Sequence, residues 1–198
     1  MEHYFTNDEN LRSEFRNIKY KIASEELDFT SDLGVFSKDK VDYGTNLLIT
    51  NYLNLGRKNI KLLDLGCGYG IIGITLSKLM NIDATLVDVN KRAVHLANIN
   101  IKKNKVNASA YESNIYSEVN DLYDVIITNP PIRTGKNIVT EFLVGAQKFL
   151  KEDGELWIVM RKEQGAKSMI EKLKKIYSVN LVDKSKGFYI IVCKKLLT

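Results

Sequence analysis

LLDLGCGYG at Leu62–Gly70 and NPPI at Asn129–Ile132 are the two stretches of this 198-residue chain that decide its fold. In the first, an apolar strand ends at an acidic residue and a glycine-rich turn. In the second, an apolar strand ends at an amide and at Pro130 and Pro131, the only two prolines in the chain. In an open parallel sheet, ligands bind beyond the carboxyl ends of such strands, at the point where the strand order switches. We therefore expect the two turns to face each other across that point.

Length and composition, with 44% hydrophobic and 27% charged residues, are those of an ordinary globular domain. The chain has no run of about 18 apolar residues that would cross a membrane, and its N-terminus lacks the features of a signal peptide. Cys67 and Cys193 have no CxxC partner, which favours a reducing cytoplasm and argues against a zinc site. The chain has only two histidines, His3 and His95, so few residues could serve in histidine catalysis or metal binding.

Positive charge is concentrated in the C-terminal part of the chain. Residues 145–198 contain 12 Lys and Arg against 6 Asp and Glu, a net charge of +6. The rest of the chain carries a net charge of −1, which gives the total of +5. A basic region of this kind suits an anionic partner such as RNA. The alternative is an ordinary solvated, lysine-rich surface.

Strand and helix periods alternate along most of the chain. Strands are expected at 60–65, 84–87, 106–111, 125–128, 156–160, 179–182 and 188–193, and helices at 45–55, 71–80, 91–103, 139–150 and 166–176. Earlier in the chain, the alternation over 15–29 predicts a β-hairpin with its turn near 24–26.

Strands that alternate with helices imply an α/β fold, a parallel sheet with helices on both faces. The last two strands, joined by the turn-prone Lys184–Gly187, are too close for a helical crossover and must be antiparallel neighbours. We predict a mostly parallel sheet with a C-terminal antiparallel hairpin over residues 43–198. Residues 1–42 would form a small N-terminal extension that carries the β-hairpin.

Glycines after a buried strand let the backbone turn sharply and approach a ligand closely. Gly66, Gly68 and Gly70 fill that role here, but the dinucleotide fingerprint needs a further glycine where this chain has Ile71, which disfavours a nucleotide-linked oxidoreductase. About 20 residues beyond the glycines, Asp88 ends the next strand and is suited to accept ribose hydroxyl protons. The alternative is that Asp88 merely caps the following helix.

Both turns resemble the signatures of methyltransferases that use S-adenosyl-L-methionine to modify amino nitrogens. Their first motif has the GxGxG spacing of residues 66–70, preceded by an acid such as Asp64. NPPIRTGK at Asn129–Lys136 is similar to the NPPIRxGK of short bacterial homologues of the small-subunit (16S) rRNA guanine-N2 methyltransferase. GVFSKDKVDYGT at Gly34–Thr45 looks like that family's GVFSxxxxDxGT stretch.

The resemblance covers nearly the whole chain and extends to Trp157–Val159 and Gln164–Ala166. It implies a Rossmann-like, seven-stranded methyltransferase fold and S-adenosyl-L-methionine as the cofactor. Longer members of the family carry an additional methyltransferase-like half at the N-terminus, which we do not expect here.

Further cofactor contacts follow from the resemblance. Asp64 would orient the amino-acid ammonium group of the cofactor, directly or through water, and Asn114 would accept a hydrogen bond from the adenine amino group. Tyr69 would pack on the methionine arm. The alternatives are that Asn114 lies in a plain turn and that Tyr69 is a surface turn residue.

Methyl transfer to an exocyclic amine requires the amine to be desolvated and aligned. The side-chain oxygen of Asn129 would accept one N–H of the amine and the carbonyl of Pro130 the other. Proline fixes its backbone and has no donor, so this carbonyl stays aimed. Such positioning contributes on the order of 7–11 kcal/mol. The alternative is that Asn129 bonds only to its own turn.

Pro131 and Ile132 would border the acceptor. Many amino-methylating enzymes have an aromatic residue at position 132, which stacks on the target base. Because this chain has Ile132, stacking would have to come from elsewhere, and Phe36, Tyr43 and Tyr69 are the candidates.

Arg133 and Lys136 would hold the phosphates beside a flipped-out nucleotide, unless they merely belong to a solvated loop. The resemblance implies ribosomal RNA or the small ribosomal subunit as the partner, and guanine N2 as the methylated atom. A glutamine amide of a protein or an adenine is an alternative acceptor. A non-catalytic RNA-binding module is disfavoured because both motifs are intact.

Overall fold

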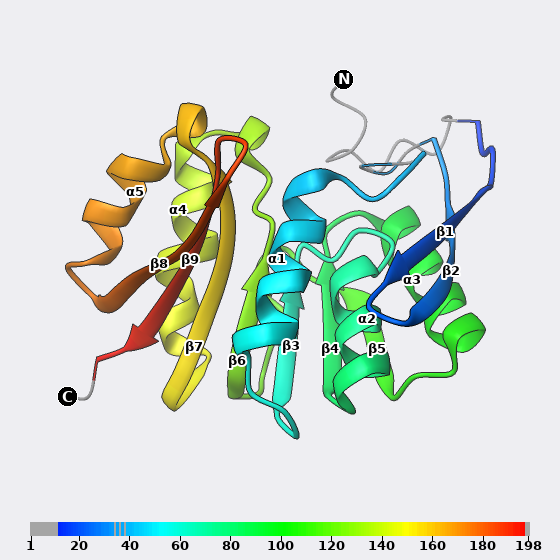
Figure 1. Cartoon of the computed structure of the whole chain (residues 1–198), viewed down its shortest axis with the longest axis horizontal. Coiled ribbons are helices and arrows are strands. Elements are labelled where there is room, and N and C mark those ends of the chain that lie inside the picture. The colour runs from blue at the N-terminus through cyan, green and yellow to red at the C-terminus, as the bar shows by residue number, and fades with distance from the viewer. Residues whose placement is uncertain (1–11, 34, 36, 38, 197–198) are drawn as a thin grey trace.

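A seven-stranded sheet forms the centre of the molecule in the computed structural model, which describes residues 12–33, 35, 37 and 39–196 (Figure 1). Its strands are β3 (Lys61–Leu65), β4 (Asp83–Asp88), β5 (Ala108–Glu112), β6 (Tyr123–Thr128), β7 (Leu150–Arg161), β8 (Tyr177–Ser185) and β9 (Phe188–Lys195). They lie in the order β5-β4-β3-β6-β7-β9-β8, with β3 to β7 parallel and β9 antiparallel to both of its neighbours. The predicted sheet and its C-terminal hairpin are confirmed.

Helices cover both faces of this sheet. One face carries α1 (Tyr43–Leu55), α2 (Ile71–Met80) and α3 (Lys91–Asn104), and the other carries α4 (Lys136–Gly145) and α5 (Ala166–Leu173). Short 3₁₀ turns occur at η1 (Ile132–Thr134), η2 (Ala146–Lys148) and η3 (Lys162–Gln164).

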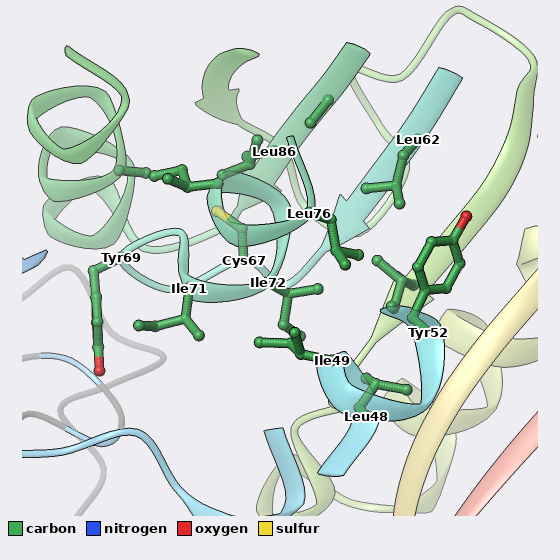
Figure 2. Packing of buried hydrophobic residues seen from close by; sticks show 14 of the residues in the cluster. Leu48, Ile49, Tyr52, Leu62, Cys67, Tyr69, Ile71, Ile72, Leu76 and Leu86 are labelled. Atoms are coloured by element: carbon green, nitrogen blue, oxygen red, sulfur yellow. The ribbon is translucent and has the colours of Figure 1, made fainter. Parts of the chain in front are cut away.

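Two apolar cores, one on each face, hold the layers together. Successive residues of β3 alternate between them: Leu62 packs with α1–α3 and Leu63 packs on the α4–α5 side, both fully buried. This two-sided burial explains why the central strands are apolar almost throughout. Figure 2 shows Leu48, Ile49 and Tyr52 of α1 turned toward the side chains of α2, so α1 is fixed against the sheet by its apolar face.

The largest differences from the predicted boundaries concern two elements. The helix expected over 139–150 begins earlier, at Lys136, and breaks at Gly145 into the turn η2. Strand β7 begins at Leu150, earlier than the predicted 156, and is irregular there, because Leu150 pairs with Tyr123 whereas Glu155 pairs with Val125. Residues 151–153 are exposed and charged, so no apolar alternation marked this part of the strand.

The predicted N-terminal hairpin is formed by β1 (Arg16–Ile22) and β2 (Glu25–Ser31), which pair antiparallel. It lies against α3 at the β5 side of the sheet (Figure 1). Asn100 of α3 accepts from the Thr30 backbone N–H (2.7 Å) and donates to the Thr30 carbonyl (2.9 Å), and Asn104 does the same with Asp28. Two asparagines one helical turn apart therefore satisfy the free edge of β2, as a neighbouring strand would.

Candidate active site

The glycine loop leaves β3 and enters α2. Gly66, Gly68 and Gly70 have φ values of 71°, 55° and 99°, in the left-handed region that side chains disfavour. The N–H groups of Gly66 and Cys67 both donate to the Val87 carbonyl at 2.9 Å. The loop is thus folded against the end of β4, and its glycines are required by the backbone.

Asp88 supports this loop from the end of β4. One carboxylate oxygen accepts from the Gly68 N–H (2.8 Å) and the other from the Asn90 N–H (2.9 Å). The cap of α3 is Asn90, whose side chain accepts from Ala93 N–H at 3.1 Å. The capping alternative for Asp88 is therefore wrong. A carboxylate has about four acceptor positions, so the predicted ribose contact is compatible with these bonds.

Asp64 is fully buried beneath the loop. Its Oδ2 accepts from the Gly73 N–H of α2 at 2.8 Å, whereas Oδ1 has no hydrogen-bond partner. Burial raises the pKa of Asp64 to about 7. A buried acceptor without a partner is costly, and a bound cationic group would satisfy it. The site therefore fits the ammonium group that the sequence assigned to this residue.

Two further predicted cofactor contacts have different surroundings. Tyr69 is only 3% exposed, so the surface-turn alternative is wrong. Its hydroxyl donates to the Ser37 carbonyl (2.9 Å), and its ring meets Phe29 edge-on. Figure 2 shows the ring directed away from the glycine loop, so its hydroxyl meets Ser37 and not a ligand in the loop. Asn114 is exposed in the turn after β5, where its backbone N–H donates to Ser117 Oγ. The predicted contacts with the methionine arm and the adenine stay predictions.

The Asn-Pro-Pro turn lies directly beside the glycine loop. Strands β3 and β6 are parallel neighbours, and Thr128 Oγ1 donates to the Leu65 carbonyl at 2.7 Å, which ties their ends together. Asn129 follows at once and is half-buried, and its Nδ2 donates to Thr45 Oγ1 of α1 at 3.0 Å. This bond joins positions 84 residues apart, so the alternative that Asn129 bonds only to its own turn is wrong.

Pro130 is buried, and its carbonyl accepts a hydrogen bond from the Ile132 N–H at 2.9 Å. The sequence pattern predicted a turn here but not this hydrogen bond within it. A carbonyl oxygen has two lone pairs, so one remains for an acceptor amine. The internal bond also fixes the direction of the carbonyl, which is what the predicted role requires.

Residues of the predicted acceptor side surround this turn. Pro131 and Ile132 are half-buried, whereas Arg133 and Lys136 are exposed in η1 and at the start of α4. Of the proposed stacking residues, Tyr43 begins α1 and is 37% exposed. Phe36, like Gly34 and Lys38 of the same motif, lies outside the described residues.

Sequence reasoning assigned no role to Asp42 and Thr45, although both lie in the motif over 34–45. Thr45 is 7% exposed and contacts Asn129, and Asp42 is the N-cap of α1. Both residues belong to the DxGT pattern of that motif, but the pattern does not indicate that Thr45 contacts Asn129 in the folded chain.

A Rossmann-like sheet of this order, with an acidic residue and a glycine loop beside an Asn-Pro-Pro turn, defines a methyltransferase domain. The chain belongs to the methyltransferase small domain family, whose model matches residues 26–192.

The chain is also similar in sequence or in fold to individual proteins. The chain is 41% identical to an uncharacterized Bacillus subtilis protein, YbxB, with 98% of each chain covered. It is 34% identical to ribosomal RNA small subunit methyltransferase C of Haemophilus ducreyi, over 71% of this chain and 44% of that protein. A solved structure of a T. thermophilus 16S rRNA N2 G1207 methyltransferase in complex with AdoMet and guanosine has a TM-score of 0.83 at 23% identity, covering 92% and 51% of the two chains. The chain thus spans about half the length of these rRNA methyltransferases.

The described part of the chain contains no group of three or more His, Cys, Asp and Glu residues that could hold a metal ion. Both cysteines are buried, and burial raises the pKa of the Cys193 thiol to about 12. No helix described here combines the length and apolar character needed to cross a membrane.

Proposed function

We propose that this protein transfers the methyl group of S-adenosyl-L-methionine to an exocyclic amino group, namely guanine N2 in 16S rRNA. The observation that carries the proposal is the bonded pair of strand ends. The Thr128–Leu65 hydrogen bond holds the Asn129 turn beside the glycine loop, so a donor and an acceptor amine held by these two turns would meet. Guanosine and AdoMet in the solved structural neighbour support this choice of reactants.

The cofactor, when bound, supplies an activated methyl group on a sulfonium. Asp64 would bind the ammonium group through its unpartnered Oδ1, and Asp88 would accept from the ribose hydroxyls. Asn114 would accept from the adenine amino group. The glycine loop brings backbone close to the ligand without side chains in between.

Asn129 and Pro130 would hold the two N–H groups of the acceptor amine. With both protons engaged, the nitrogen lone pair is directed at the methyl carbon. The aligned nitrogen would take the methyl group as the donor releases it, and one of the two protons held by Asn129 and Pro130 would leave to solvent. The protein contributes alignment, which is worth on the order of 7–11 kcal/mol for well-oriented reactants.

A cluster of cations on aromatic rings supports RNA as the partner. Arg161 lies 4.6 Å from the Phe188 ring centre, Lys186 lies 4.7 Å from that of Tyr43, and the two rings are 5.7 Å apart. Tyr43 precedes by two positions the Thr45 that contacts Asn129, so this cation–aromatic cluster flanks the proposed acceptor site. The Tyr43 ring is exposed and the Phe188 ring half-buried, and accessible rings with adjacent cations suit stacking on unpaired bases and contact with phosphates. The cluster would supply the stacking that Ile132 cannot.

The proposal is tested by transfer of tritiated methyl from the cofactor. Acceptors are small ribosomal subunits, free 16S rRNA and total protein, each from cells in which the gene is deleted, and Asn129→Ala is the control. We expect label in RNA, recovered as N2-methylguanosine after digestion to nucleosides. Label in N6-methyladenosine or protein glutamine would move the activity to another acceptor. Binding of RNA and cofactor without transfer to any acceptor would favour a non-catalytic RNA-binding module.

A further inference from the structure

We propose that Asp42 and Thr45 fix the orientation of the Asn129 side-chain amide, so that its oxygen and not its NH2 group faces the acceptor amine. They would act as positioning residues, because neither is placed against the reacting atoms. This inference rests on the proposed function, in which Asn129 Oδ1 accepts an N–H of the substrate.

Three hydrogen bonds at the start of α1 form a directed chain. Asp42 is the N-cap, and its Oδ2 accepts from the Thr45 backbone N–H at 3.1 Å. Its Oδ1 accepts from the Thr45 hydroxyl at 2.6 Å. Thr45 Oγ1 in turn accepts from Asn129 Nδ2 at 3.0 Å. The direction of the last bond follows from that of the hydroxyl bond.

The single hydroxyl proton of Thr45 determines this direction. A carboxylate is the stronger acceptor, and the short Thr45–Asp42 bond is typical of charge-assisted pairing. Once the proton is directed at Asp42, Thr45 Oγ1 can only accept. The amide of Asn129 then has one compatible orientation, with Nδ2 toward Thr45. Rotation by 180° would place Oδ1 against another oxygen that has no proton to offer, in a site where Thr45 is 7% exposed.

The orientation matters because the oxygen of an amide accepts a hydrogen bond from an amine, whereas the NH2 group of an amide donates one. Oδ1 accepts an N–H and leaves the nitrogen lone pair free for the methyl carbon. An NH2 group in the same place would repel the amine protons or donate to the lone pair itself. A population with the amide reversed would therefore bind cofactor normally and fail to align the acceptor.

Capping of α1 by Asp42 is the purely structural explanation of these contacts, and Asp42→Asn separates the two roles. Asparagine caps helices about as well as aspartate, so the helix start is preserved. Its side-chain NH2, however, can donate to Thr45 Oγ1, which frees the hydroxyl proton to bond Asn129 Oδ1. The chain of bonds is then reversed while the fold is retained.

The first experiment compares Asp42→Asn, Thr45→Val and Thr45→Ser with the unchanged protein in the tritium assay. We expect kcat to fall at least about tenfold in Asp42→Asn and Thr45→Val, on the scale of one lost positioning contact, and to stay within about twofold in Thr45→Ser. Cofactor affinity and Tm should change little in all three. Unchanged kcat in both Asp42→Asn and Thr45→Val would overturn the proposal, as would a fall in kcat explained by an equal loss of cofactor affinity.

A second readout needs neither substrate nor turnover. The side-chain NH2 signals of Asn129 are assigned by nitrogen-15 NMR from their loss in Asn129→Asp. We expect slow exchange of the bonded amide proton in the unchanged protein and in Thr45→Ser, and fast exchange in Thr45→Val. Equal exchange in all of them would overturn the orientation argument even if the enzyme is active.

Failure of this inference is distinct from failure of the proposed function. If Asn129→Ala is inactive while Asp42→Asn and Thr45→Val remain fully active, only the orienting role is lost. If Asn129→Ala keeps full activity, the proposed mechanism itself is wrong.

Discussion

Replacing Asn100 by alanine should loosen the N-terminal hairpin and weaken cofactor binding together. Asn100 is fully buried in α3. Besides its two bonds to Thr30 of β2, its Nδ2 donates to the Tyr69 carbonyl in the glycine loop at 2.8 Å. One side chain therefore connects the hairpin, α3 and the loop that we propose binds the cofactor.

The size of the effect follows from these three hydrogen bonds. A net contribution of about 1 kcal/mol for each gives a loss of about 3 kcal/mol in unfolding free energy, and each backbone group left unpaired would increase this loss. The single bond to the Tyr69 carbonyl, also worth about 1 kcal/mol, corresponds to a roughly fivefold weaker cofactor affinity.

Asn104→Ala is the matched control. Asn104 lies one turn later on α3 and makes comparable bonds, to both backbone groups of Asp28 and to the Asn100 carbonyl, but none of these reaches the glycine loop. Urea unfolding measures stability, and calorimetry with S-adenosylhomocysteine measures affinity. We expect both variants to lose stability and only Asn100→Ala to lose affinity. Equal affinity in the two variants would refute the proposed connection between hairpin and loop.

Four further predictions concern Asp64, Gly73 of α2 and the acceptor side. Burial raises the pKa of Asp64 to about 7, and a bound ammonium group favours the ionised carboxylate. Cofactor affinity should therefore rise by up to about tenfold per pH unit as the pH approaches about 7. Calorimetry measures this rise, which Asp64→Asn should lose. The same raised pKa makes the cofactor-free fold lose stability as the pH rises from 3.8 to about 7, which urea unfolding across that range measures. Gly73→Ala should cost about 1–3 kcal/mol in unfolding free energy, because its new Cβ would lie 2.9 Å from Leu86 and 3.1 Å from Asp64 Oδ2. The logarithm of the affinity for RNA should fall linearly with the logarithm of the salt concentration. If Arg133 and Lys136 both contact phosphates, replacing them should reduce that slope by about 1.5 in a filter-binding titration. An unchanged slope would show that neither side chain contacts a phosphate.

Most of the sheet could be predicted from local pattern. The alternation of apolar strands with amphipathic helices fixes a parallel sheet, and the four residues Lys184–Gly187 leave no room for a crossover between β8 and β9. The start of β7 could not be predicted, because its exposed residues 151–153 show no alternation of apolar and polar positions. The docking of the hairpin was also unpredictable, since it depends on two asparagines of α3 that meet β2 only in the folded chain.

In the candidate site, too, features set by neighbouring residues could be predicted from the sequence, whereas contacts between distant residues could not. Left-handed backbone at Gly66 and Gly68 follows from the glycines themselves. The bond between Asn129 and Thr45 does not, because it joins positions 84 residues apart through the packing of α1. The occupied carbonyl of Pro130 depends on a turn whose geometry the two prolines permit but do not specify.

The most direct test of the account is a crystal structure of the protein with S-adenosylhomocysteine and guanosine. We predict the homocysteine ammonium at Asp64, the ribose at Asp88, and the guanine N2 about 3 Å from both Asn129 Oδ1 and the Pro130 carbonyl. Binding of S-adenosylhomocysteine away from the glycine loop, or a guanine whose N2 does not contact Asn129, would contradict it.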